Sequence, residues 1–150
     1  MPPAILGRGT PMSTDSDKKT AAPERRLFAK GTTIFKLGDT ADAAYIVESG
    51  AINIFKTLSG KRISLGTVGP RGIFGELALL DPSQRMASAV ASEDSICAVI
   101  TKDSMDQMLA TAPPGLLVLM RSMAQTIRSA GEELADARFR LQELERQEAG

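Results

Sequence analysis

The rest of the chain is organised around the stretch FGELALL, residues Phe74 to Leu80; Asp81-Pro82-Ser83-Gln84 and then Arg85-Met86-Ala87-Ser88-Ala89 follow it directly. It places a glycine at a turn, a carboxylate at the start of a short apolar helix, and an arginine one loop later. The unpaired N–H groups at a helix N-terminus and a guanidinium both attract anions. The combination therefore indicates a site for an anion with a hydroxyl beside it, which Glu76 would accept.

The composition limits the partners of the chain. Its 150 residues carry 18 basic and 18 acidic side chains, so no net charge draws the protein to nucleic acid or anionic lipid. No apolar run approaches the roughly 18 residues that a membrane helix needs, and Ala4 to Leu6 is too short for a signal peptide. We therefore expect one globular domain with an appendage in a cytoplasmic protein, with neither nucleic acid nor membrane as partner.

The sequence contains no histidine, which removes Ser-His-Asp and Cys-His catalysis and most imidazole metal sites. Catalysis by carboxylates alone remains open, but we expect no enzyme, no catalytic residue, no metal and no cofactor. The single cysteine, Cys97, lies in an apolar strand pattern. We interpret it as a buried small hydrophobe rather than a reactive thiol.

The chain changes character after residue 26. Residues 1–26 are rich in proline and polar residues and predict a flexible N-terminal tail. Beyond them, short β-branched, aromatic or alternating runs separated by glycine turns predict a small antiparallel barrel or sandwich. The expected strands are Leu27–Gly31, Thr33–Phe35, Ala44–Glu48, Ile52–Lys56, Arg62–Val68, Ala87–Ala91 and Ser95–Thr101.

The spacing from Gly75 through Glu76 to Arg85 resembles the phosphate-binding cassette of cyclic nucleotide-binding domains, and the run from Phe35 to Gly50 resembles the first strands of that family. The resemblance covers about Leu27 to Leu144. It implies a mainly β fold, an eight-stranded antiparallel β-roll of jelly-roll type flanked by short helices, with the nucleotide-binding domain at residues 27–112.

Carried over to this chain, the resemblance implies that Arg85 pairs with the cyclic phosphate and that Glu76 accepts the ribose 2′-hydroxyl. Other cassette residues would line the pocket or offer backbone N–H groups to the anion: Phe74, Gly75, Leu77, Met86 and Ala87. The alternative is an ordinary ion pair between Glu76 and Arg85 that caps a turn. We favour the ligand site, because surface ion pairs contribute little.

Two departures from the family concern the base. Members that favour cGMP often carry Thr or Ser after the arginine, where this chain has Met86, so we expect cAMP rather than cGMP. The Thr-Ser pair that contacts adenine in the bacterial regulators falls at Ala130 and Gly131, which lack hydroxyls. The candidates for base contacts are then Arg128 and Ser129, and base discrimination should be weak.

Residues 113–148 predict a long C-terminal helix that serves as lid and dimerisation element. A heptad seam, typical of a two-stranded coiled coil, recurs at Leu116, Met120, Met123, Ile127, Ala130, Leu134, Ala137, Leu141 and Leu144. In a parallel pair, Glu133 would face Arg138 of the partner and Arg140 would face Glu145. We therefore expect a parallel homodimer through residues 116–144, rather than one helix folded on its own barrel.

Two details of this helix complete the prediction. Leu117 and Leu119 lie outside the seam and are expected to pack on the barrel. Gly131, a residue that weakens helices, would act as a flex point between the two halves of the helix.

The resemblance to the transcription regulators ends at this helix, since no helix-turn-helix domain follows. We therefore expect a stand-alone cyclic nucleotide receptor that signals through its dimeric helix to an unidentified protein partner. The alternative is a dimeric interaction or scaffold protein with a degenerate nucleotide pocket.

Overall fold

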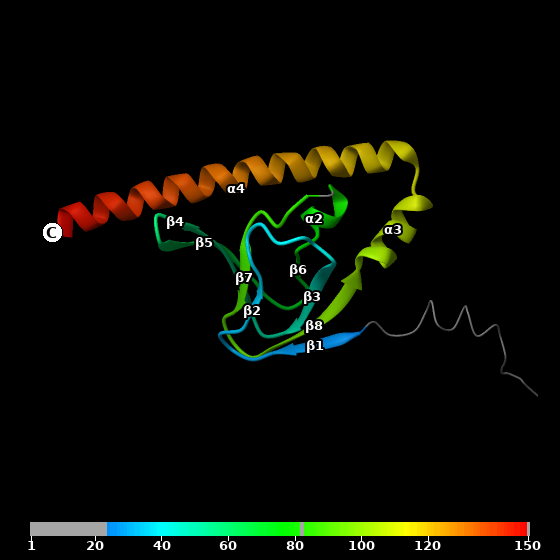
Figure 1. The fold of residues 1–150 in the computed structure, drawn as a ribbon, viewed down its shortest axis with the longest axis horizontal. Coiled ribbons are helices and arrows are strands. Elements are labelled where there is room, and N and C mark those ends of the chain that lie inside the picture. The colour runs from blue at the N-terminus through cyan, green and yellow to red at the C-terminus, as the bar shows by residue number, and fades with distance from the viewer. Residues whose placement is uncertain (1–23, 82, 150) are drawn as a thin grey trace, which may run out of the picture.

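The computed structural model describes residues 24–81 and 83–149 (Figure 1). Most of the predicted tail, residues 1–26, lies outside the described residues. The first strand already begins at Arg25, so Arg25 and Arg26 belong to the β domain and not to the tail.

The described residues form two four-stranded antiparallel sheets, which confirms the predicted β-roll. One sheet has the order β1-β8-β3-β6 and the other β2-β7-β4-β5. The strands of the first sheet are β1 (Arg25–Phe28), β3 (Ala43–Ser49), β6 (Ile73–Phe74) and β8 (Ser95–Thr101). Those of the second are β2 (Thr33–Phe35), β4 (Ile52–Leu58), β5 (Lys61–Val68) and β7 (Ser88–Ala91).

The main core lies between the two sheets, because inward-facing residues from both meet there. It combines Tyr45 and Val47 of β3 with Ile52 of β4 and Cys97 of β8, all nearly inaccessible to water. Cys97 is fully buried, as predicted, and its burial raises the pKa of the thiol. A thiol in this position is protonated and shielded, and it behaves as a small hydrophobe.

The hairpin between β4 and β5 turns at Ser59 and Gly60, both of which have positive φ (51° and 77°). Two consecutive residues of this kind form the two-residue turn whose twist matches that of the flanking strands. The predicted hairpin is therefore present, and Figure 1 shows it reaching toward the C-terminal half of the long helix.

The helices occur where the sequence predicted them. α2 (Leu77–Leu80) is the short helix after Gly75, and α3 (Lys102–Ala110) follows the last strand. The buried side chains of α2 pack against Met105 of α3 in a second, smaller core. α2 therefore contributes to packing as well as to the site. The two-residue strand β6 was not predicted.

The long helix α4 (Pro114–Ala149) lies against its own roll, over α2 and β5 (Figure 1). On its contact face Ala124 and Ala135 are fully buried, and the large side chains of Leu117, Met120 and Phe139 are partly buried. At its far end Lys61 Nζ forms an ion pair with Glu143 at 2.8 Å, and Arg138 donates a hydrogen bond to the Ser64 carbonyl. None of the described helices is both long and apolar enough to cross a membrane.

A second, apolar face of α4 is exposed in the single chain. Its large side chains belong to the predicted seam: Leu116, Met123, Ile127, Leu134, Leu141 and Leu144. Near the start of the helix the prediction was wrong for two residues, because Leu119 is exposed on this face whereas Met120 is half-buried against the roll. Contact with the roll and an exposed seam therefore coexist on one helix.

Candidate functional site

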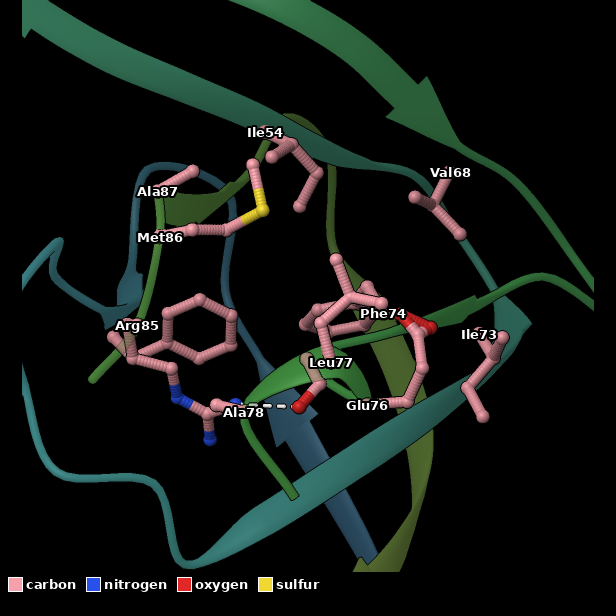
Figure 2. A pocket seen from close by; sticks show the side chains of 12 residues that line it. Ile54, Val68, Ile73, Phe74, Glu76, Leu77, Ala78, Arg85, Met86 and Ala87 are labelled. Carbon is pink, nitrogen blue, oxygen red and sulfur yellow. Dashed lines mark hydrogen bonds between the residues drawn. The ribbon is translucent and has the colours of Figure 1, made fainter. Parts of the chain in front are cut away.

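The cassette forms one wall of a pocket of about 530 Å³, counting its open mouth. We call it the cassette pocket. All seven predicted ligand-binding residues line it: Phe74, Gly75, Glu76, Leu77, Arg85, Met86 and Ala87. Figure 2 shows Arg85, Met86 and Ala87 on one side of the pocket and Glu76 and Leu77 on the other.

Arg85 lies almost completely inside the protein, with 4% of its surface exposed. Its Nη1 donates to the Gly75 carbonyl at 2.7 Å, and its Nη2 donates to the Ala43 carbonyl at 2.5 Å. The guanidinium carbon stands 4.0 Å from the centroid of the Phe35 ring. The Nε has no hydrogen-bond partner among the described residues. The guanidinium is thus held at two corners and one face, while part of its donor capacity is unused.

The charge of Arg85 persists in this environment. Burial lowers its pKa, and the nearby Tyr45, Asp42, Asp39 and Glu76 act in the opposite direction. An arginine starts from so high a pKa that it stays protonated at neutral pH. The pocket therefore contains a permanent positive charge.

Gly75 makes the close packing around Arg85 possible. Its φ is +81°, a value that side-chain-bearing residues rarely adopt. A Cβ at this position would lie 2.9 Å from Arg85 Nη1 and 3.2 Å from Phe35 Cε2. A glycine is required here by both the backbone conformation and the available space.

Glu76 occupies the N-cap position of α2, yet its side chain makes no capping hydrogen bond. Burial raises the pKa of this carboxyl, and a hydrogen bond from its own backbone N–H together with the charge of Arg85 only partly opposes the effect. Within residues 24–81 and 83–149, no ion pair joins Glu76 to Arg85. The alternative of a turn-capping ion pair is not what the structure contains. Two charged groups instead line one pocket without neutralising each other directly.

A second hollow lies between α4 and the strands β4 and β5. We call it the helix groove. Its lining is almost entirely apolar: Ile54, Leu65, Gly66, Thr67, Val68, Leu77, Met86, Ile127, Ala130, Gly131 and Leu134. Ile54, Val68, Leu77 and Met86 line both hollows. The cassette pocket and the helix groove are therefore adjacent parts of one cleft.

Met86 reaches from the cassette to α4. Its terminal carbon Cε would lie 2.6 Å from a Cβ built at Gly131, so the absent side chain of Gly131 makes room for Met86. Figure 2 shows the side chain extending toward Ile54. A side chain at position 131 would therefore require the end of Met86 to move.

The two candidates for base contacts lie elsewhere on α4. Ser129 is exposed, and Arg128 is directed toward Asp81 with its Nε 3.9 Å from Oδ2. Gln125 also donates to Asp81, and Arg121 donates to the Leu80 carbonyl. Neither Arg128 nor Ser129 lines the cassette pocket or the helix groove. Their role in contacting a base remains a prediction.

Five pocket residues were not predicted from the sequence: Phe35, Ile54, Val68, Ile73 and Ala78. Four of them come from strands β2, β4, β5 and β6, far from the cassette in the chain or outside its motif. The alternation of these strands marks their inward-facing positions, but it does not reveal which of them meet the cassette. Among the described residues, no group of three or more His, Cys, Asp or Glu side chains could hold a metal ion.

Comparison with known proteins gives the following matches. Residues 25–112 match the family model described as the cyclic nucleotide-binding domain. The chain is 37% identical over 112 residues to the cyclic AMP receptor protein of Thermus thermophilus, covering 74% of this chain and 52% of that protein. The chain therefore spans about half the length of this curated relative.

Solved structures resemble the fold as well. The cAMP-bound form of the EAL enzyme Bd1971 matches with a TM-score of 0.71 and 33% identity, covering 83% of this chain and 33% of that one. The cGMP-bound form of the same enzyme matches with a TM-score of 0.67 and 36% identity, covering 70% of this chain and 28% of that one.

Proposed function

This chain belongs to the cyclic nucleotide-binding domain family, and we propose that it is a cyclic nucleotide receptor that prefers cAMP to cGMP. The observation that supports the proposal most is the buried guanidinium of Arg85 in the cassette pocket. It has unused donor capacity, and no carboxylate of the described residues is paired to it. A cyclic phosphodiester carries one negative charge and would match this positive charge.

Glu76 would bind the sugar. Its carboxylate is partly desolvated, as the raised pKa indicates, and it makes no capping hydrogen bond. A ribose 2′-hydroxyl that donates to this carboxylate would offset the cost of burying the charge. The N–H of Leu77, in the first turn of α2, would add a donor for the phosphate.

The base would extend toward the helix groove, where nearly all the lining is apolar. Met86 offers no strong donor or acceptor to the amino group of guanine, which supports a preference for cAMP. The preference should be small, because an apolar wall recognises the shape of a purine more than its polar edge. The cAMP-bound and cGMP-bound forms of the related EAL enzyme are consistent with a site of this kind that takes either base.

We further propose that two copies associate in parallel through the seam of α4. Its large apolar side chains are exposed in the single chain, whereas the face that contains Ala124 and Ala135 is buried on the roll. A partner helix would cover the exposed face without displacing the roll. The predicted pairing of Arg138 with Glu133 of the partner would compete with its bond to Ser64.

Calorimetric titration of the purified protein with cAMP, cGMP and the acyclic 5′-AMP tests the nucleotide proposal. We expect binding of both cyclic nucleotides, a several-fold preference for cAMP, and much weaker binding of 5′-AMP. Bound nucleotide would first be removed and identified by mass spectrometry. If folded, nucleotide-free protein gives no heat of binding with either cyclic nucleotide, the proposal is refuted.

The dimer requires a separate test. Leu141→Glu changes an exposed seam residue beyond the end of the helix groove, so nucleotide binding should survive. Light scattering after gel filtration should find a dimer for the unchanged protein and a monomer for the variant. A monomer in both cases would refute the dimer and leave the nucleotide proposal intact.

The alternative, a dimeric interaction module with a degenerate pocket, draws on two observations. The side chain of Met86 already fills the space opposite Gly131, and Arg85 is almost fully buried. Partner capture that is insensitive to added cyclic nucleotide, combined with silent titrations, would favour this alternative.

A further inference from the structure

One aromatic residue of the cassette pocket, Phe35, comes from outside the cassette sequence. Phe35 ends β2, in the sheet opposite to the one that carries β6 and leads into the cassette. It lines the cassette pocket, and its ring centroid lies 4.0 Å from the guanidinium carbon of Arg85. A cation this close to a ring face is attracted by the ring's quadrupole, and more strongly when water is excluded.

Phe35 is itself firmly held. Its ring centroid lies 6.0 Å from that of Phe74 and 6.4 Å from that of Tyr45, and Phe74 and Tyr45 are stacked at 5.1 Å. Phe74 and Tyr45 are almost completely buried in the main core. A ring that packs on two core aromatics has little freedom to move, so it presents a fixed face to Arg85.

The remaining contacts of Arg85 do not fully determine its orientation. The carbonyls of Gly75 and Ala43 hold Nη1 and Nη2, but Nε has no partner in the described part of the chain. Both hydrogen bonds act at the Nη end of the group and lie near its plane. The ring of Phe35 adds a contact on the face of the guanidinium, which resists tilting of that plane.

We propose that Phe35 is a positioning residue of the cassette pocket: its ring fixes the plane of the Arg85 guanidinium before any ligand is present. The proposal rests on the proposed function in one respect, that Arg85 is the group that binds the phosphate. A phosphate then meets donors that are already oriented, and binding does not have to order a flexible side chain. Phe35 acts through Arg85 and does not itself bind the phosphate.

The chain offers a matched control for this contact. On the β4–β5 hairpin, Arg62 stacks over Phe55 with its guanidinium carbon also 4.0 Å from the ring centroid. Phe55 lines neither the cassette pocket nor the helix groove. Phe55→Leu therefore removes a contact of the same kind and measures the cost to the fold alone.

The first test uses the protein without nucleotide. In the ¹H–¹⁵N spectrum of arginine side chains, the Nε–H signal of Arg85 should be shifted by the ring current and exchange slowly with water. Phe35→Leu should remove the ring-current shift and speed the exchange, Phe35→Tyr should retain both features, and Phe55→Leu should leave the Arg85 signal unchanged. An Arg85 signal that is identical in Phe35→Leu and in the unchanged protein would overturn the proposal.

The second test is calorimetric titration with cAMP. We expect Phe35→Leu to weaken binding on the order of 10-fold, while Phe35→Tyr, which keeps the ring, binds like the unchanged protein. Equal binding by Phe35→Leu and the unchanged protein, or equal losses in the Leu and Tyr variants, would refute the positioning role. If the unchanged protein binds no cyclic nucleotide, the proposed function fails, and the spectrum of the free protein still decides the role of Phe35.

Discussion

The cassette pocket and the helix groove are adjacent, yet they are built on opposite principles. In the cassette pocket, Arg85 is fixed by two carbonyls and an aromatic ring, and Glu76 is partly desolvated. In the helix groove the walls are apolar and the flexible Met86 fills the space opposite Gly131. Rigid, oriented donors suit a charged group, whereas an apolar wall can be adaptable because dispersion contacts have no fixed direction.

The largest effect should come from Arg85→Ala, which removes the charge of the cassette pocket. We expect cAMP binding to weaken by about 2 to 5 kcal/mol, the range found when one member of a buried charged contact is truncated. The variant also leaves the Gly75 and Ala43 carbonyls without their donor, so its melting temperature must be measured alongside calorimetry. Arg62→Ala is the control, because Arg62 stacks on Phe55 away from both hollows. A small loss of affinity in Arg85→Ala would show that the fixed guanidinium is not the main contact of the phosphate.

Glu76→Gln should have the next largest effect. The amide keeps the shape of the side chain but exchanges a charged acceptor for a neutral one, which should weaken cAMP binding by about 1 kcal/mol. Calorimetry of this variant should also show a smaller loss for 2′-deoxy-cAMP, which lacks the hydroxyl assigned to Glu76. Equal losses of affinity for the two ligands would show that Glu76 does not bind the ribose 2′-hydroxyl.

The same variant should be more stable than the unchanged protein at neutral pH. Burial raises the pKa of Glu76 above the value of 4.5, so the folded state binds the proton more tightly than the unfolded state does. The folded protein therefore loses stability as the pH rises through the range above 4.5, and the uncharged amide of the variant avoids this loss. Thermal unfolding at pH 7 and at pH 4 should show the advantage of Glu76→Gln at pH 7 only. An advantage that is independent of pH would exclude the carboxyl as its source.

A smaller effect is expected in the helix groove. Gly131→Ala places a methyl group where Met86 Cε now lies, and the flexible methionine should yield at little cost. Since alanine favours a helix by about 1 kcal/mol over glycine, the melting temperature should rise. The affinity for cAMP should change by less than about 1 kcal/mol, and a double-mutant cycle with Met86→Ala should show a coupling of about 0.5 kcal/mol. Additivity would mean that the two residues do not meet in solution.

The smallest effect should follow from Asp81→Asn, at the contact between the end of α2 and α4. Asp81 accepts a hydrogen bond from Gln125 and lies near Arg128. Partly exposed contacts of this kind contribute about 0 to 1 kcal/mol, so global stability should change little. Hydrogen exchange should nevertheless quicken in the first half of α4, while Lys61 and Glu143 still hold its far end. Uniform exchange along α4 would show that the helix is held as a single unit.

Much of the fold was predictable from local patterns. Seven strands, the turn at Ser59 and Gly60 and the extent of α3 follow from alternation, glycine positions and helix spacing. The strand β6 was missed because two residues carry no periodicity, and its existence depends on pairing with Tyr45 and Ile46 of β3. The predicted environments of Leu119 and Met120 were interchanged, because both residues fit a helical stripe and only contact with the roll distinguishes them.

The candidate site was likewise predictable only in part. The seven cassette residues that line the pocket come from one short stretch of the chain, so the spacing of glycine, glutamate and arginine was enough to group them. Phe35 and Ile54, by contrast, come from strands that are distant from the cassette in the sequence. Arg128 and Ser129 were proposed by counting along the helix, and a count cannot tell which face of a helix meets the cleft.

The cassette, a small antiparallel β domain and the exposed seam of the last helix follow from the sequence alone, because each depends on residues that are neighbours or repeat at a fixed period. The support of the arginine depends on tertiary packing. Phe35, Ala43 and Gly75 reach Arg85 from three segments of the chain, and the two sheets must be packed before they meet. The tertiary structure likewise decided that the glycine on α4 lies opposite Met86, since that contact depends on where a rigid helix crosses the roll.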